Sequence, residues 1–242
     1  MISIFFWILI ALLGLVAIVV VGFLVYRSDR QARNGPALEI TAANGIVDGR
    51  FVTLGGIEQW ISIRGEDRGN PVILVLHGGP ATSYMSFTAL FRAWEKHFTV
   101  VQWDRRGVGK TFGSNGRAGS REMTLDRIVS DGIELAELLR QELGKPKIIL
   151  LGHSMGSMIG VAMAARRPDL FHAYVGTEQI VDMAPNEEAS YRLILERARE
   201  QHNDKAIKRL VRIGPPPYES AAHWGVKQRQ AEVAEQPPIR TP

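Results

Sequence analysis

The sequence contains no cysteine among its 242 residues. Disulfide bonds, zinc-thiolate sites and cysteine nucleophiles are therefore excluded, and the redox compartment stays open. A long basic stripe is also missing, because the basic residues behind the net charge of +4 are scattered, partly as pairs such as Arg105-Arg106. Nucleic-acid binding is therefore not expected. Low-complexity tracts and internal repeats are lacking too, and the charged fraction of 22% is ordinary, so the chain is expected to fold.

No cofactor motif is present in the sequence. The segment Gly107-Val108-Gly109 follows an expected strand, but it lacks the third glycine and the acidic partner of a dinucleotide site. We therefore expect no cofactor and no metal site, and the oligomeric state stays open.

Charge is absent from a long N-terminal segment, Ile4 to Tyr26. A helix rises about 1.5 Å per residue, so this segment is long enough to cross a hydrocarbon core of about 30 Å. A basic start and a small-residue cleavage site are missing, which favours an uncleaved single-pass anchor over a signal peptide or a buried core helix. Arg27, Arg30 and Arg33 follow the span and nothing basic precedes it, so the positive-inside bias predicts a cell-membrane protein with a cytoplasmic C-terminal side.

The remaining sequence divides into a linker and a folded part. Residues 1–27 are expected to form the anchor, and the polar residues 28–45 a linker. Residues 46–182 then alternate strand-like and helix-like segments, which predicts an α/β fold with a mostly parallel sheet and flanking helices. Residues 183–242 carry only helical patterns. The expected elements are strands at 51–54, 58–63, 72–76, 98–103, 148–151 and 173–181, and helices at 86–96, 125–143, 155–165, 186–201, 204–211 and 219–235.

A nucleophile motif lies between a predicted strand and a predicted helix. Gly152-His153-Ser154-Met155-Gly156 matches G-x-S-x-G, in which a strained turn exposes a serine above the sheet. Small residues are needed at both glycine positions, because side chains there would collide with the neighbouring strand or helix. We therefore predict that Ser154 is the nucleophile and that the backbone amide of Met155 is one donor of an oxyanion hole.

The second oxyanion donor is expected in the loop after the strand at 72–76. His77-Gly78-Gly79-Pro80 lets the backbone approach a substrate carbonyl closely, and we expect the amide of Gly79 to complete the hole. A plain tight turn is the alternative for this loop alone, but the elbow that follows favours the catalytic interpretation.

Three motifs together resemble the proline iminopeptidase branch of the α/β-hydrolases. They are the 77–80 loop, the block from Trp103 to Thr111, and the elbow with Ser157. Over about residues 45–214 the resemblance implies an α/β-hydrolase fold with a helical cap, and a serine hydrolase that removes N-terminal residues, often proline, from peptides or amides. The family usually has glycine where Ala81 stands and tryptophan where Met155 stands, so the chain departs from the family pattern at these two positions beside the expected oxyanion hole.

The Asp-x-Arg-Gly-x-Gly pattern matches a loop near the family's site. A salt-bridged structural turn explains it best, and neither Arg105 nor Arg106 is expected to be catalytic. The residues of the pattern are Asp104, Arg106, Gly107 and Gly109.

The triad partners of Ser154 cannot be assigned from the sequence. A serine needs a histidine base held by an acid, and in this fold both follow later strands. The histidines and aspartates after Ser154 are better explained as ordinary surface or cap residues: His172, His202, His223, Asp169, Asp182 and Asp204. We therefore expect the chain to stop inside the cap, with the triad acid and histidine unknown. Cap carboxylates that could bind a substrate amine are equally explained as solvated charges: Glu187, Glu188, Glu196 and Glu219.

Three functions remain open at this point. The first is an aminopeptidase-like serine hydrolase acting through an acyl-enzyme at Ser154 on a small peptide or amide. The second is a catalytically incomplete fragment or pseudoenzyme, and the third is a carboxylic ester hydrolase.

Overall fold

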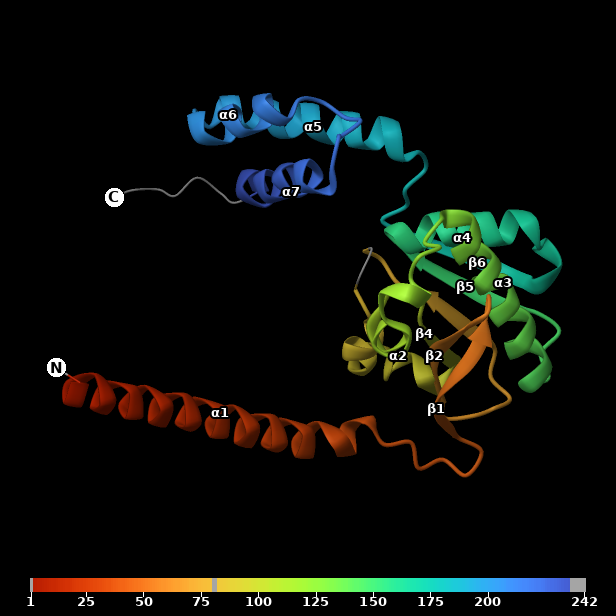
Figure 1. Ribbon diagram of the computed structural model, residues 1–242. Coiled ribbons are helices and arrows are strands. Elements are labelled where there is room, and N and C mark those ends of the chain that lie inside the picture. The colour runs from red at the N-terminus through yellow and green to blue at the C-terminus, as the bar shows by residue number, and fades with distance from the viewer. Residues whose placement is uncertain (1, 80–81, 236–242) are drawn as a thin grey trace. The chain divides into compact units, whose positions relative to one another are not determined.

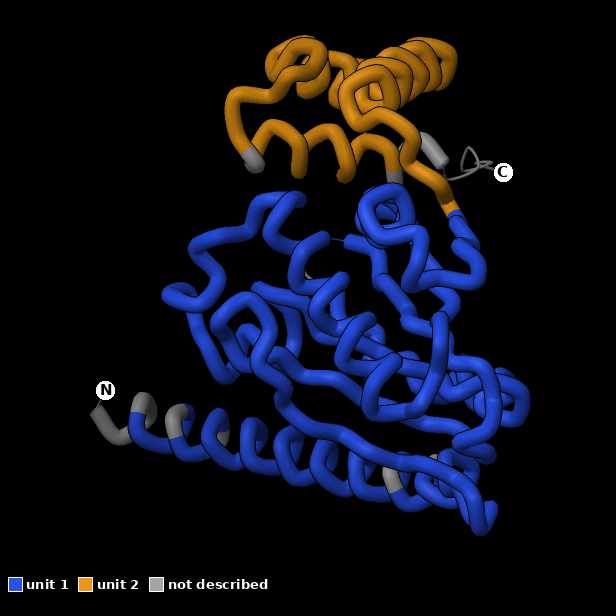
Figure 2. The backbone as a smooth tube through the Cα atoms, turned by 90° about the vertical axis from the view of Figure 1, so that its right-hand side faces the viewer, with its two compact units in different colours: residues 1–177 blue, residues 178–242 orange. Residues whose placement is uncertain are grey.

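The computed structural model describes residues 2–79 and 82–235 of the chain. It divides into two compact units, Met1–Thr177 and Glu178–Pro242, each of which is described by itself (Figure 2). Among the described residues, the first unit holds an N-terminal helix and a six-stranded sheet with flanking helices, and the second holds three helices.

The N-terminal helix α1 spans Ile2–Leu38. Its segment Phe6–Arg30 is long and apolar enough to cross a membrane, and none of it is buried in the structure; a signal sequence would share these properties. The helix covers residues 28–38 of the expected linker, where Arg33 pairs with Asp29 one turn earlier at 2.9 Å and adds local helical support.

The sheet has the strand order β1-β2-β4-β3-β5-β6 (Figure 1). The first two strands form the expected hairpin around Gly55 and Gly56, and β2 also pairs antiparallel with β4. The other pairs are parallel, which confirms the mostly parallel sheet predicted from the sequence. The strands are β1 (Ile46–Leu54), β2 (Ile57–Gly65), β3 (Val72–Leu76), β4 (Thr99–Asp104), β5 (Ile148–His153) and β6 (Phe171–Thr177).

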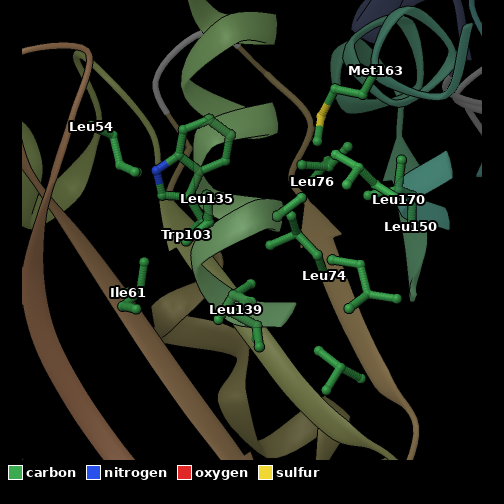
Figure 3. Close-up of a cluster of buried hydrophobic side chains, with 14 of the residues drawn as sticks. Leu54, Ile61, Leu74, Leu76, Trp103, Leu135, Leu139, Leu150, Met163 and Leu170 are labelled. Atoms are coloured by element: carbon green, nitrogen blue, oxygen red, sulfur yellow. The ribbon is translucent and has the colours of Figure 1, made fainter. Parts of the chain in front are cut away.

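Two long helices, packed on each other, cover one face of the sheet. Helix α3 (Leu125–Glu142) begins where the Thr124 side chain accepts from the Arg127 amide and ends before Gly144, as the sequence predicts. Helix α4 (Met155–Arg166) packs on α3 and on β3, β5 and β6. Leucines from β3, β5 and α3 fill the space between them together with Trp103 and Met163 (Figure 3). Every residue of β3 and β4 is buried, as expected for strands covered on both faces.

The structure differs from the sequence expectations in several short elements. The helix expected at 86–96 is two 3-10 helices, η1 (Tyr84–Phe91) and η2 (Trp94–Lys96). Helix α2 (Gly109–Gly119) was missed, because its glycines weaken any helical pattern. A short 3-10 turn, η3 (Pro168–Leu170), leads into β6, which starts and ends earlier than expected.

The second unit consists of the three expected helices with a small core of their own. They are α5 (Met183–Glu200), α6 (Asp204–Ile213) and α7 (Ala221–Glu235). Tyr191, Ile194 and Leu210 are buried between α5 and α6. The buried Lys227 of α7 donates to Glu187 at 2.8 Å and to Ser190 at 3.2 Å, which ties α7 to α5.

Candidate active site

Ser154 occupies the sharp turn between β5 and α4. Its backbone has φ 50° and ψ −120°, a strained conformation for a residue with a side chain. The surrounding structure holds it: the Ser154 amide donates to the Thr177 carbonyl at 3.0 Å, and the Ser157 hydroxyl donates to the Ser154 carbonyl at 2.6 Å. The strand-turn-helix setting predicted for the G-x-S-x-G motif is present.

Gly152 and Gly156 are required by close backbone contacts. A Cβ on Gly156 would lie 1.9 Å from the Leu76 carbonyl oxygen, and one on Gly152 would lie 2.7 Å from the Gly156 oxygen. Helix α4 therefore starts directly against the end of β3, at a distance that no side chain permits.

The glycine loop after β3 lies beside the elbow. The parallel pairing of Leu76 with Gly152 starts both loops at the same level of the sheet. A Cβ on Gly78 would lie 3.0 Å from the Ser154 Cβ, so the two loops touch. Gly79 adopts the left-handed region with φ +59°. The predicted nucleophile and the loop that carries the predicted donor Gly79 are thus together, and Pro80 and Ala81 lie outside the described residues.

Met155 is the first residue of α4, and Ser154 occupies the position before it. The first amides of a helix have no intrahelical acceptor and carry the positive end of the helix dipole. The N–H of Met155 can therefore donate a hydrogen bond to an anionic oxygen near Ser154.

The buried side chain of Arg105 contacts the glycine loop through its guanidinium. Its Nη1 donates to the His77 carbonyl at 2.6 Å, and its Nη2 donates to the Gly79 carbonyl and reaches the Gly78 carbonyl at 3.4 Å. Its Nη2 also lies 3.7 Å from the Met155 sulfur. Burial lowers the pKa of Arg105 to about 10, so it stays protonated at neutral pH.

Three polar side chains surround the base of the loop. Burial, and next the Arg105 charge, lower the pKa of His77 to about 3, so its ring is neutral and is a poor proton acceptor at neutral pH. His77 Nδ1 lies 3.0 Å from Arg105 Nη1 and 2.9 Å from the Gly78 carbonyl oxygen. The Tyr84 hydroxyl lies 2.6 Å from His153 Nδ1, which places η1 over the elbow.

The turn at residues 104–109 is held by buried charges, as the structural interpretation predicts. Arg106 donates from Nε to Asp131 at 3.1 Å and from Nη2 to the Gly55 carbonyl at 2.9 Å. Asp131, fully buried, also accepts from Arg127 at 2.8 Å and from Gln59 at 2.8 Å. Arg106 therefore ties the hairpin, α3 and the turn together rather than facing Ser154.

Neither His172 nor Asp169 is placed to assist Ser154. His172 is the second residue of β6, whereas Thr177 at the other end pairs with His153 beside the elbow. Five residues of strand at about 3.3 Å each separate the two ends by about 16 Å, beyond direct proton transfer. Asp169 precedes β6 at the same far end, where its ion pair with Arg167 at 2.6 Å lowers its pKa.

The remaining acid and histidine candidates belong to the second unit. Asp182 caps α5 by accepting from the Ala184 amide at 3.0 Å. Five further candidates of this unit are exposed to solvent: His202, Asp204, Glu188, Glu196 and Glu219. His223, on α7, is only partly exposed.

One cavity of this unit, about 560 Å³, is lined by Glu187 and Glu188, two of the carboxylates that the sequence left unassigned, together with Tyr218. Burial, helped by Glu187, raises the pKa of Tyr218 to about 12.

Two residues near the elbow were missed as contributors to the site. Arg105 lies in the Trp103–Thr111 block, but its contact with the 77–79 loop depends on the parallel pairing of β3 and β4. No sequence pattern identifies Tyr84 as part of the site, because its contact with His153 depends on how η1 packs over the sheet.

Known proteins with similar sequences share the fold described above. The family model described as the alpha/beta hydrolase fold matches residues 71–206. A probable aminopeptidase of Bacillus subtilis, YbaC, is 34% identical over 169 residues, which is 69% of this chain and 52% of that protein. A proline iminopeptidase of Saccharolobus solfataricus is 27% identical over 182 residues, 72% of this chain and 54% of that protein.

Solved structures support the same fold. The proline iminopeptidase-related protein of Thermus thermophilus superimposes with a TM-score of 0.51 at 20% sequence identity, covering 78% of this chain and 67% of that chain. The chain spans about half the length of the Bacillus subtilis and Saccharolobus solfataricus relatives. The family model covers more than half of the chain and includes both the glycine loop and the elbow, so the chain belongs to the α/β-hydrolase fold family.

Proposed function

We propose that this protein is a serine hydrolase that cleaves a small peptide or amide at its N-terminal residue through Ser154. The observation that carries the proposal is the strained elbow, which places Ser154 against Gly78 of the glycine loop. The aminopeptidase and proline iminopeptidase names of the two relatives point to peptides and amides as the substrate class.

In this proposal Ser154 Oγ attacks the carbonyl carbon of the scissile amide. The carbonyl oxygen becomes an anion that accepts hydrogen bonds from the amides of Gly79 and Met155. The serine proton passes to a general base and then to the leaving amine, and the C–N bond breaks to give an acyl-enzyme. Water then attacks the acyl carbon, releases the acid and restores the serine. The base and its acid partner are not assigned to residues of this chain.

A fluorophosphonate probe tests the nucleophile directly. Ser154 Oγ forms a bond to phosphorus, fluoride leaves, and the serine proton goes to the base. The full chain in detergent micelles is expected to be labelled, and Ser154→Ala is expected to lose all of the label. Equal labelling of Ser130→Ala and wild type serves as the control, because Ser130 is on α3 and its hydroxyl donates to the Asp126 carbonyl at 3.0 Å. Labelling of wild type that Ser154→Ala does not reduce would exclude Ser154.

A binding protein with an incomplete triad is the second candidate. The observation that favours it is the placement of the four histidines of the first unit. His77 contacts Arg105, and His153 contacts Tyr84. His97 follows η2 and His172 is near the start of β6, both away from the elbow. Under this candidate, turnover of prolyl arylamides and of p-nitrophenyl esters is no faster for wild type than for Ser154→Ala. Faster turnover of the esters than of the amides would instead favour a carboxylic ester hydrolase.

We also propose that α1 is a single-pass anchor with the hydrolase unit in the cytoplasm. Its support is the uncharged span followed by Arg27, Arg30 and Arg33. Because the chain lacks cysteine, Ser114→Cys on the exposed surface of α2 provides a single label site. A membrane-impermeant maleimide is expected to label it only after permeabilisation of the cells, and labelling in intact cells would reverse the orientation.

A further inference from the structure

We infer that Arg105 is a positioning residue that holds the glycine loop in the orientation needed for an oxyanion hole. This inference rests on the proposed function, since it concerns the donors that would face the anion formed at Ser154. It adds a role for a side chain that touches neither the nucleophile nor, in the proposed mechanism, the substrate.

The contacts of Arg105 are directed at one short segment of backbone. Its guanidinium reaches the carbonyl oxygens of His77, Gly78 and Gly79 in succession, as well as the ring of His77. An arginine fork carries five donors in one plane, so a single side chain can hold consecutive carbonyls that a lysine could not. Arg105 is 2% exposed, and its charge therefore faces this loop and not water.

These contacts determine which way the loop amides point. In a trans peptide the C=O of one residue and the N–H of the next point in opposite directions. Because the carbonyls of His77 and Gly78 face Arg105, the N–H groups of Gly78 and Gly79 point away from it. A peptide flip at this loop would break the contact with Arg105 and turn the amide of Gly79 away from its proposed task.

The position of Gly78 shows that the elbow lies against this loop. A Cβ on Gly78 would meet His153 Nδ1 at 2.7 Å and the Ser154 Cβ at 3.0 Å. Arg105 also contacts the sulfur of Met155, whose amide is the other proposed donor. One buried side chain thus touches the residues on both sides of the proposed oxyanion hole.

Arg106, the adjacent arginine, shows what a purely structural role looks like in this turn. Its partners include the carboxylate of Asp131, and the pair links distant elements. The contacts of Arg105 described above are instead to neutral groups of the glycine loop and to Met155. The two neighbouring buried arginines therefore have different roles: Arg106 stabilises the fold, and Arg105 holds the glycine loop.

The test compares Arg105→Met and Arg105→Lys with wild type and with Arg127→Gln, all as full chains in detergent micelles. Arg127→Gln is the matched control, because it also removes one arginine charge near the 104–109 turn while its contacts run to Asp131 and Glu134. Two readouts are taken: hydrogen exchange of the peptide covering residues 77–84, and saturation kinetics of fluorophosphonate labelling.

We expect Arg105→Met to exchange the 77–84 amides at least tenfold faster, with unchanged exchange in β3 and β5. Its maximal labelling rate is expected to fall at least tenfold with little change in probe affinity, because the oxyanion donors stabilise the transition state and not the bound probe. Arg105→Lys should fall between Arg105→Met and wild type, and Arg127→Gln should match wild type in both readouts.

Each failure has its own signature. Faster loop exchange in Arg105→Met together with no labelling of the wild type supports the positioning role and overturns the proposed function. Unchanged exchange and an unchanged labelling rate in folded Arg105→Met overturn the positioning role and leave Ser154 in place. If Arg105→Met does not fold, the same comparison on Arg105→Lys decides, and wild-type values there overturn the inference.

Discussion

Asp131→Ala is expected to lower the free energy of unfolding by about 3–5 kcal/mol, which is the range for removing one partner of a buried ion pair. Asp131 is fully buried and accepts from three side chains, Arg106, Arg127 and Gln59. Without it, the guanidinium of Arg106, whose side chain is 4% exposed, stays buried with no carboxylate to balance its charge.

Chemical denaturation of the full chain, followed by tryptophan fluorescence, measures this effect. Trp103 is a suitable reporter, because its indole donates to Gln59 at 3.0 Å and Gln59 in turn donates to Asp131. Glu134→Ala is the matched control: its carboxylate pairs with Arg127 but is 45% exposed, and an exposed pair contributes at most about 1 kcal/mol. Equal stability of Asp131→Ala and Glu134→Ala would contradict the structural role assigned to this network.

Gly156→Ala is expected to reduce Ser154 labelling about 100-fold and to cost up to about 3 kcal/mol of stability, although it adds only one methyl group. The new Cβ would lie 1.9 Å from the Leu76 carbonyl oxygen, and backbone cannot yield as a flexible side chain does. Helix α4 must move away from β3, and Ser154 and Met155, which open that helix, move with it.

Gly113→Ala is the control for the same change in another helix. A Cβ at Gly113 meets nothing within 4 Å, and alanine favours a helix over glycine by about 0.5–1 kcal/mol, so α2 should be slightly stabilised. Labelling rates and thermal melts of both variants give the comparison. Wild-type labelling by Gly156→Ala would show that the elbow tolerates a wider separation of α4 and β3.

Much of the framework follows from local pattern. The apolar run at 72–76 and the turn at Gly55 predicted β3 and the hairpin, because burial on both faces and tight reversals leave direct marks on composition. Helix α3 was predicted from its apolar spacing and its stop at Gly144. Helix α2 was not, because glycines interrupt its helical pattern, and its packing on β2 and β4 is a contact between segments that are distant in the sequence.

The sequence by itself determined the identity of the elbow and of the glycine loop, because strained turns and close backbone approaches demand glycine at fixed spacing around Ser154 and at Gly78. Only the tertiary structure decided what surrounds them. The pairing of β3 with β4 and β5 brings Arg105 to the 77–79 carbonyls and Gly78 to Ser154, and it leaves His172 at the far end of β6. Arg105 and its three carbonyl partners are 26 to 28 positions apart in the sequence. No local pattern encodes them, because they depend on the strand order and register of the whole sheet.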